Sequence, residues 1–256
     1  MQSLVISLEK ATERRKHISN EFGKQNINYD FFDALTPDLA EPLAKKMGLN
    51  IQDQLLSKGE LACFMSHVSI WQKMVDENIP YLAIFEDDVY LGENAQEFLI
   101  SETWIDSHWD IIKIEAFADK VFLSGATSQV GQGRRNIIQL AGKNLGTAGY
   151  ILSLNGAKKY LQYIREIRLI PLDQVMFDTF IHDRIHQVYQ MTPALCIQEM
   201  MLFPQQKTVL SSDLLAERKE RMSKQKKTGW SKIQLEIERV FKQIKYAFCG
   251  RKVEFK

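Results

Sequence analysis

Short apolar runs and amphipathic segments alternate along most of the chain. Residues 4–8, 81–85 and 110–114 are apolar runs, each typical of a strand buried in a sheet. Apolar residues also recur at helical spacing from Gly59 to about Asn78, which predicts a long amphipathic helix. The predicted buried face of this helix consists of Leu61, Phe64, Met65, Val68, Trp71, Met74 and Val75.

Weaker patterns complete the expected fold. Residues 124–146 are rich in Gly, Ser, Asn and Gln, which is typical of a long loop beside a binding site. The other expected elements are a helix over 9–25, a strand over 29–32, a loop with a short helix over 34–58, a strand over 150–152, a helix to Arg165 capped by Ser153 or Asn155, a helix after Pro171 and a strand around Val188. Strands alternating with helices predict an α/β protein with a largely parallel sheet.

Charge divides the chain into two parts. The 256 residues include 33 Lys and Arg and 32 Asp and Glu, but residues 214–256 hold 13 of the basic and 5 of the acidic ones. This last part has a net charge of +8, and the rest has a net charge of −7. We therefore expect a catalytic domain over residues 1–214 and a basic appendage over residues 215–256.

The appendage is predicted to contain an amphipathic helix. Such a helix suits an anionic membrane surface, where each Lys or Arg contributes about 1 kcal/mol. The alternative is a helix that packs its apolar face on the domain. Nucleic acid is not an expected partner, because the body is acidic and few aromatic residues of the tail are expected to be exposed. The apolar positions are Ile233, Ile237, Val240, Phe241, Ile244 and Phe248, and the basic ones are Lys232, Arg239, Lys242 and Lys245.

The amino terminus lacks a basic segment followed by a long apolar run, which argues against a secretory signal. No apolar stretch approaches the roughly 20 residues that span a bilayer. Cys63, Cys196 and Cys249 form no C-x-x-C pair, which argues against a disulfide framework or a zinc site. We expect a cytoplasmic protein that lies peripherally on the inner face of the cytoplasmic membrane.

Three consecutive carboxylates, Glu86-Asp87-Asp88, directly follow the apolar run 81–85. Like charges repel, and their desolvation is unfavourable unless a cation is present. Ligand sites of parallel α/β sheets lie at the carboxyl ends of strands, where this triplet falls. Hard oxygen donors there suit Mg²⁺ or Mn²⁺ shared with a substrate diphosphate. The alternative is a solvated acidic turn. No P-loop or Rossmann glycine sequence is present to bind phosphate instead.

A series of motifs runs through the predicted domain. They are Val5-Ile6-Ser7-Leu8 with Arg14-Arg15, Gly59-Glu60-Leu61-Ala62-Cys63-Phe64-Met65-Ser66-His67 with Trp71, Ile84-Phe85-Glu86-Asp87-Asp88, Gly146-Thr147-Ala148-Gly149-Tyr150-Ile151 with Gly156-Ala157, Pro171-Leu172-Asp173, and Gln198 with Ser212-Asp213. In this order and spacing they resemble glycosyltransferase family 25, which includes bacterial lipooligosaccharide galactosyltransferases and the collagen galactosyltransferases. The resemblance covers about residues 3–214. Ala62 stands where the family usually has glycine, and Ser7 where asparagine is common.

The resemblance implies a single GT-A-like, Rossmann-type domain that binds a nucleotide-sugar. It implies a UDP-hexose donor, with galactose before glucose, a lipid-linked lipooligosaccharide acceptor, Mn²⁺ or Mg²⁺, and inversion at the anomeric carbon. In such enzymes the acidic motif holds the metal, so Asp88 is the first candidate ligand and Glu86 the second. Asp87 would lie beside them or contact the ribose. The metal acts as a Lewis acid on the departing UDP.

Further candidates would serve as the catalytic base or as donor contacts. An inverting transfer needs a carboxylate to take the acceptor's proton. Asp173 is one candidate, with an ordinary helix cap as the alternative, and Glu115 is the rival. By the resemblance, the donor-contacting residues are Ser7, Leu8, Arg14, Arg15, His67, Glu86 and Asp87. The alternatives are solvated positions for the two arginines and a satisfied histidine within the predicted helix for His67.

Two other functions are compatible with a nucleotide-binding α/β fold. A nucleotidyltransferase would normally carry a Gly-rich, basic loop after the first strand, and Glu9-Lys10-Ala11-Thr12 stands there instead. A non-catalytic nucleotide-sugar-binding protein would keep the fold without the chemistry, and the intact acidic triplet argues against it.

Overall fold

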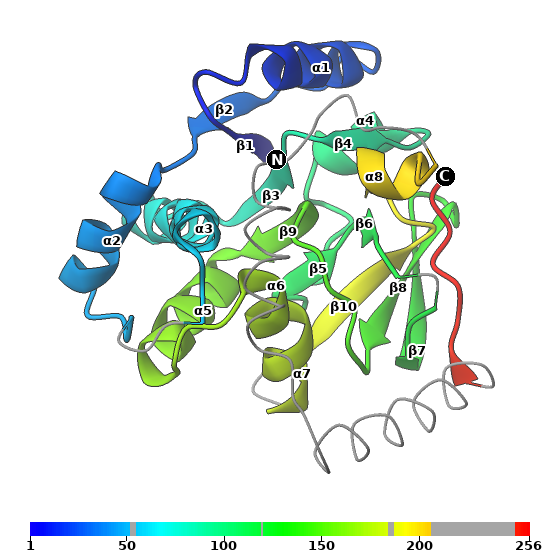
Figure 1. Ribbon diagram of the computed structural model, residues 1–256. Helices are drawn as coiled ribbons and strands as arrows, with labels where there is room; N and C mark the ends of the chain where they lie inside the picture. Colours follow the sequence, from blue (N-terminus) through cyan, green and yellow to red (C-terminus); the bar gives the residue numbers. More distant parts are fainter. Residues whose placement is uncertain (52–54, 119, 184–186, 206–248) are drawn as a thin grey trace.

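The computed structural model describes residues 1–51, 55–118, 120–183, 187–205 and 249–256 (Figure 1). Its main sheet is formed by eight strands, which are β1 Gln2–Ser7, β2 Asp30–Asp33, β3 Tyr81–Glu86, β5 Ile111–Lys113, β7 Leu123–Val130, β8 Arg135–Leu140, β9 Gly149–Ser153 and β10 Val188–Thr192. Their order across the sheet is β2-β1-β3-β9-β5-β10-β8-β7. The α/β class expected from the sequence is confirmed.

The sheet is mixed, so the expectation of a largely parallel sheet is wrong. Strand β1 is parallel to β2 and β3, and β5 is parallel to β10. Strand β9 lies antiparallel between β3 and β5, and β8 is antiparallel to β10 and to β7. The alternation of apolar and helical segments could not fix these directions, because strands rather than a crossover helix connect β5 to β9.

Helices lie on both faces of the main sheet (Figure 1). They are α1 Thr12–Gly23, α2 Pro37–Lys46, α3 Lys58–Asp76, α4 Ala95–Leu99, α5 Leu154–Glu166, α6 Leu172–Gln174, α7 Phe180–His182 and α8 Glu199–Leu202. Leu4 and Ile6 of β1 join the core that includes α2, α3 and α5, whereas Val5 joins the core that includes α1 and α4. Burial on both faces explains why the strand sequences are continuous apolar runs.

The two longest helices begin at side-chain caps. At the start of α3, Ser57 Oγ accepts a hydrogen bond from Glu60 N at 3.1 Å, and Glu60 Oε2 accepts one from Ser57 N at 2.9 Å. This capping box fixes the first turn of the helix. At the start of α5, Ser153 Oγ accepts from Gly156 N at 2.9 Å, so Ser153 rather than Asn155 is the cap.

The expected long loop over residues 124–146 is wrong, because most of this segment belongs to the β7–β8 hairpin. Strand β7 lies at the edge of the sheet and exposes most of its side chains, so its sequence lacks an apolar run. Gly131, Gln132 and Gly133 have positive φ angles in the connecting turn, where glycine adopts this conformation without a steric penalty.

The helix expected after Pro171 is present but interrupted. A π-helical segment, Val175–Thr179, joins α6 to α7. Phe177 leaves the helical conformation there and its carbonyl accepts a hydrogen bond from Asn144 N at 3.1 Å. The interruption therefore ties this helix to the segment that follows the β7–β8 hairpin. Such π-helical insertions are frequent at functional sites.

A second sheet extends from the carboxyl edge of the first. It contains β4 Val89–Leu91, β6 Glu115–Ala116 and β11 Cys196–Gln198, in the order β4-β11-β6. Strand β4 follows β3 after a two-residue turn, and β11 pairs with β4 so that Gln198 lies opposite Val89. This pairing carries Gln198 to the end of β3.

The last described segment, residues 249–256, packs on the domain. Arg251 pairs with Val121, Phe255 pairs with Ala194, and Arg135 Nη2 donates to the Lys256 carbonyl at 2.7 Å. The amphipathic helix expected around residues 232–248 lies outside the described residues. In the described part of the chain, no helix has the length and apolar character needed to cross a bilayer.

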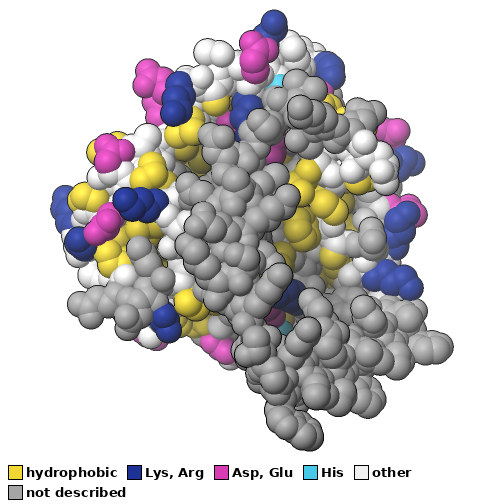
Figure 2. All heavy atoms as spheres, viewed as in Figure 1, with side chains coloured by type: hydrophobic (Ala, Val, Ile, Leu, Met, Phe, Trp, Pro, Cys, Tyr) yellow, Lys and Arg dark blue, Asp and Glu magenta, His cyan; other side chains and the backbone are white. Residues whose placement is uncertain are grey.

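Charged side chains of both signs are interspersed over the described part of the face in Figure 2. Hydrophobic side chains lie between them, and no large region of a single sign is visible there. On this part of the surface, recognition of a charged ligand therefore depends on local groups rather than on a broad electrostatic field.

Candidate active site

The acidic triplet lies at the carboxyl edge of the main sheet, in the turn from β3 to β4. Strand β1 runs parallel to β3 with Ile6 opposite Glu86, so both strands end at this edge. Strand β9 runs in the other direction and begins here. Asp87 and Asp88 are only 6% and 9% exposed, so the triplet is not a solvated turn.

Asp87 is held by groups from β1 and α1. Ser7 Oγ donates a hydrogen bond to Asp87 Oδ2 at 2.6 Å. Arg14 forms an ion pair with Asp87 Oδ1. Two of the predicted donor contacts, Ser7 and Arg14, are therefore brought to the triplet. Because Asp87 already has a cationic partner, it is the least suitable of the three carboxylates to bind a metal.

Glu86 is contacted from three elements. Thr147 Oγ1, just before β9, donates to Glu86 Oε1 at 2.6 Å, and Gln198 Nε2 of β11 lies 3.4 Å from Oε2. His67 Nε2 of α3 lies 3.7 Å from Oε1. Burial alone would raise the pKa of Glu86, but His67, Thr147 and Arg14 together outweigh it and hold this pKa below its usual value.

The negative charge of Asp88 is compensated less well by its neighbours than that of Glu86. Gln198 Nε2 donates to its two oxygens at 3.2 and 3.4 Å, and Arg14 Nη2 lies 3.7 Å from Oδ2. The Asp88 carbonyl accepts a hydrogen bond from Glu199 N at 3.0 Å, which fixes the backbone of the turn. Burial, followed by the charge of Glu86, raises the pKa of Asp88 to about 7.

The negative charge of the triplet exceeds the positive charge that the described residues place against it. Among the described residues, Arg14 is the one Lys or Arg side chain that pairs with these three carboxylates. Glu86 and Asp88 consequently retain negative charge in a partly buried position, which is unfavourable. Their oxygen atoms form a donor set that fits Mn²⁺ or Mg²⁺, and such an ion would remove this electrostatic cost.

Arg15 is directed to the end of β1 rather than to the triplet. Its Nε donates to the Leu8 carbonyl at 3.2 Å, and its Nη2 donates to the Ser7 carbonyl at 3.1 Å. It also pairs with Asp33, and its guanidinium lies 4.7 Å from the centre of the Phe31 ring. Arg15 therefore fixes the backbone of Ser7 and Leu8, the other two residues predicted to contact the donor at this strand end.

Glu115 is fully buried behind the triplet. It accepts hydrogen bonds from Lys113 Nζ at 2.7 Å and from Ala148 N at 3.2 Å, and Lys113 Nζ also donates to the Gly146 carbonyl at 2.6 Å. Burial raises the pKa of Glu115 to about 7, although Lys113 opposes the shift. This side chain has no exposed surface, so it is poorly placed to contact an acceptor. Its position is better suited to holding segment 146–148, which carries Thr147.

Asp173 approaches the cluster from α6 and is 7% exposed. Its Oδ1 accepts a hydrogen bond from Gln174 N at 2.9 Å. Burial, followed by the charges of Glu86 and Asp173, raises the pKa of the Cys63 thiol well above its usual value. Helix α6, which carries Asp173, packs against α3, which carries Cys63.

The structure adds site residues that sequence reasoning did not single out. Thr147 and Gln198 are direct partners of the triplet, although both belong to motifs that resemble the family. Cys63 also faces Glu86 and was missed because only paired cysteines were considered. The spacing Cys63-x-x-x-His67 indicates this site in the sequence, since residues four apart lie on one face of a helix.

Comparison with known proteins relates this site to carbohydrate transfer. A sequence model of glycosyltransferase family 25 (LPS biosynthesis protein) matches residues 1–176. The chain is 38% identical over 232 residues to the lipooligosaccharide biosynthesis protein lic2B of Haemophilus influenzae, which covers 87% of this chain and 85% of that protein. It is 38% identical over 232 residues to the lacto-N-neotetraose biosynthesis glycosyltransferase LgtE of Neisseria gonorrhoeae, with coverages of 86% and 82%.

A solved structure of a glycosyltransferase involved in the glycosylation of the major capsid of PBCV-1 aligns with a TM-score of 0.42 and 12% identity. The alignment covers 77% of this chain and 93% of that chain.

The electrostatic cost at Asp88 predicts that Asp88→Asn stabilises the metal-free protein at pH 8 but not at pH 4. The folded-state pKa of about 7 lies above the unfolded value of about 3.9, so ionised Asp88 disfavours folding. This cost is absent below about pH 4 and complete above about pH 7. At about 1.4 kcal/mol per pKa unit, the gain at pH 8 is at most about 4 kcal/mol.

Urea unfolding in the presence of a chelator measures this free energy at both pH values. Asp106→Asn is the control, since hydrogen bonds from His108 lower the pKa of this exposed carboxyl and its removal should give no gain. Equal or lower stability of Asp88→Asn at pH 8 would show that the triplet is not electrostatically strained.

The packing around Glu115 predicts that Gly146→Ala is more destabilising than Gly133→Ala. Both glycines have positive φ, +89° and +82°, so both substitutions carry a backbone cost of about 1–2 kcal/mol. Only at Gly146 would the new Cβ approach the Glu115 carboxylate, at 2.6 Å, whereas at Gly133 the nearest atom is 3.8 Å away. Unfolding free energies should therefore differ by at least about 1 kcal/mol; equal losses would contradict the close contact.

Proposed function

The chain belongs to glycosyltransferase family 25, and from this premise we propose that it transfers a hexose from a UDP-sugar to a lipooligosaccharide acceptor. The transfer inverts the anomeric carbon and is assisted by Mn²⁺ or Mg²⁺. Galactose is the first candidate sugar, because the motifs resemble those of galactosyltransferases, and glucose is the second. The acceptor class is supported by the similarity to lic2B, a lipooligosaccharide biosynthesis protein.

The observation that carries this proposal is the excess negative charge of two carboxylates at a strand end, the buried Asp88 and the partly buried Glu86. Asp88 and Glu86 would hold the cation, since Asp87 is already paired with Arg14. When bound, the cation supplies Lewis-acid stabilisation of the diphosphate leaving group. Gln198 and Thr147 hold the two carboxylates through neutral hydrogen bonds, so these oxygens are oriented before the donor binds.

The end of β1 offers a site for the nucleoside and the diphosphate. Arg14 lies next to Asp88 and adds positive charge where the phosphates would meet the cation. Ser7 and Leu8 form the strand end, and Arg15 keeps their carbonyl groups in place. Arg14, Ser7 and Leu8 would contact the donor, and Arg15 would keep Ser7 and Leu8 in place. These contacts would orient the bond between the sugar and the diphosphate for attack by the acceptor.

Asp173 is our proposed base for the acceptor hydroxyl. It is a carboxylate on α6, the helix that packs against α3, and it retains 7% of its surface exposed. Taking the hydroxyl proton as the acceptor attacks would allow direct displacement of UDP. Glu115 instead supports the Thr147 segment, because its side chain is fully buried against Lys113.

We also propose that residues 1–214 form the catalytic domain and that the basic residues 215–256 attach it to the cytoplasmic face of an anionic membrane. The net charge of +8 over this last part supports membrane attraction. Residues 249–256 lie on the domain, where Arg251 pairs with Val121. Contact with lipid would therefore come from the residues before this terminal segment.

UDP release tests the proposed reaction. With UDP-galactose or UDP-glucose, a lipooligosaccharide acceptor and Mn²⁺, the wild-type chain should release UDP and a chelator should abolish the release. Asp88→Asn should lower turnover by at least about 100-fold, because it removes a charged ligand and leaves the leaving group poorly stabilised. Asp106→Asn, an exposed control, should retain activity.

Full activity of Asp88→Asn would overturn the metal assignment. Binding of UDP-sugar without either transfer or donor hydrolysis would instead indicate a non-catalytic binding protein.

Comparison of Asp173→Asn with Glu115→Gln tests the assignment of the base. Asp173→Asn should lower kcat by about 10²–10⁴-fold while the KM for the UDP-sugar changes little, because proton removal is lost and donor contacts remain. Glu115→Gln should change kcat much less, because the Glu115 side chain is fully buried against Lys113 and does not reach an acceptor. Steady-state kinetics of both variants give kcat and KM, and urea unfolding checks that both are folded; the reverse pattern would assign the base to Glu115.

A further inference from the structure

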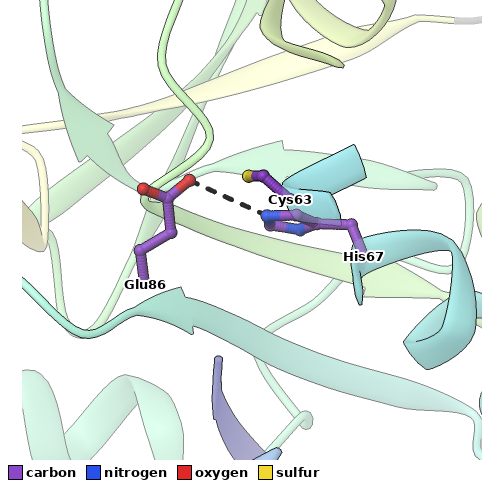
Figure 3. Close-up of side chains that lie close together, drawn as sticks. All are labelled: Cys63, His67 and Glu86. Carbon is purple, nitrogen blue, oxygen red and sulfur yellow. Dashed lines mark ion pairs between the residues drawn. The ribbon is translucent and has the colours of Figure 1, made fainter. Parts of the chain in front are cut away.

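A second set of potential metal ligands lies beside the triplet, on the side that faces α3. Cys63 and His67 are one helical turn apart and extend from α3 toward Glu86 at the end of β3 (Figure 3). One ligand atom from each residue, a thiol sulfur, an imidazole nitrogen and a carboxylate oxygen, lies within 4.8 Å of the other two. These three side chains thus converge on one point.

His67 Nε2 gives an independent indication that a ligand belongs there. The side chain of His67 is fully buried, and Nε2 has no hydrogen-bond partner among the described residues. A buried polar atom without a partner costs about 1–3 kcal/mol, so a native structure that retains one calls for an explanation. This nitrogen faces Glu86 Oε1 at 3.7 Å, and Cys63 lies at the same point.

The opposite nitrogen of the ring is held in the manner of a metal-binding histidine. His67 Nδ1 lies 2.8 Å from the Tyr150 hydroxyl, which also accepts a hydrogen bond from Trp71 Nε1 at 2.9 Å. Tyr150 and Trp71 are both fully buried, so the ring orientation is fixed by the core. In the tautomer that donates Nδ1–H to Tyr150, the lone pair of Nε2 is directed at Cys63 and Glu86.

We propose that Cys63 Sγ, His67 Nε2 and a Glu86 carboxylate oxygen bind a thiophilic divalent cation of the Zn²⁺ class. Sulfur and imidazole ligands select such a cation, whereas the all-oxygen set at Asp88 suits Mn²⁺ or Mg²⁺. Tetrahedral zinc ligands lie about 3.3–3.7 Å from one another, so the pair His67 Nε2 and Glu86 Oε1 is already close to this spacing. Binding releases the thiol proton of Cys63 to solvent and leaves a thiolate on the metal.

Three protein ligands leave the fourth coordination position to water, so the ion is exchangeable rather than enclosed. Cys63 and Glu86 both retain exposed surface, which gives the cation a route to the site. Glu86 belongs to both ligand sets. If the proposed function holds, zinc bound here withdraws Glu86 from the catalytic cation and inhibits transfer, but zinc binding itself does not depend on that function.

Cobalt spectroscopy of the full-length, metal-stripped chain tests the site directly. Co²⁺ replaces zinc in such sites, and a Co²⁺–thiolate bond gives a charge-transfer absorption that oxygen and nitrogen ligands alone do not give. We expect this band to saturate at one equivalent of Co²⁺ and to disappear when Zn²⁺ is added. Cys63→Ser should remove the band and weaken zinc binding, measured by competition with a chromophoric chelator, at least about tenfold.

Cys249→Ser is the matched control, because it removes an exposed cysteine that is not among the three proposed ligands and should leave the band unchanged. Circular dichroism and urea unfolding check that Cys63→Ser is folded. No charge-transfer band in the wild-type chain, or the same band in Cys63→Ser, would overturn the proposal and leave a protonated thiol packed beside a histidine–glutamate pair.

Asp88→Asn separates this site from the proposed catalytic metal. The variant should keep the cobalt band and its zinc affinity within about threefold, because Asp88 is not among the three ligands. It should at the same time lose Mn²⁺-dependent UDP release. Loss of the band in Asp88→Asn would show that a single site containing Asp88 was measured, which contradicts the proposal of a separate ligand set.

Discussion

In the described part of the chain, three carboxylates at the end of one strand share a single arginine, and the surrounding structure is arranged around this imbalance. Serine, threonine and glutamine side chains donate hydrogen bonds to the carboxylates, which fixes their positions without removing their charge. Neutral donors therefore fix the geometry of the site but leave its negative charge uncompensated. Under the proposed function a divalent cation would remove this electrostatic cost, and the cost would then contribute to the affinity for that cation.

Sheet topology explains how residues far apart in sequence reach this point. Two neighbouring parallel strands, β1 and β3, end at the same edge and supply Ser7 and the triplet. Strand β9 is antiparallel, so its first residues, rather than its last, lie there and supply Thr147. Buried behind them, the pair Lys113 and Glu115 holds the backbone of segment 146–148. A wholly parallel sheet would have placed the start of β9 at the opposite edge.

Continuous apolar runs identified the central strands, because these strands are buried on both faces of the sheet. Apolar residues at helical spacing identified α3. The edge strand β7 is mostly exposed, so its sequence contains no apolar run. The direction of each strand depends on how the strands are connected, which the spacing of apolar residues does not show. At the site, the position of Glu86–Asp88 after a strand was sufficient to find the acidic cluster. The pairing of Arg14 with Asp87, and the burial of Glu115 against Lys113, depend on side-chain packing and could only be seen in the structure.

The pKa values of Glu86 and Asp88 are displaced in opposite directions, and one cause links the two. His67 and Thr147 stabilise charge on Glu86, so Glu86 stays ionised, and that charge helps burial to raise the pKa of Asp88 to about 7. The two protonation equilibria are therefore coupled, because the charge on Glu86 disfavours a second charge on Asp88. A divalent cation held by both carboxylates, as we propose, would favour the ionised form of each and would oppose the rise in the pKa of Asp88.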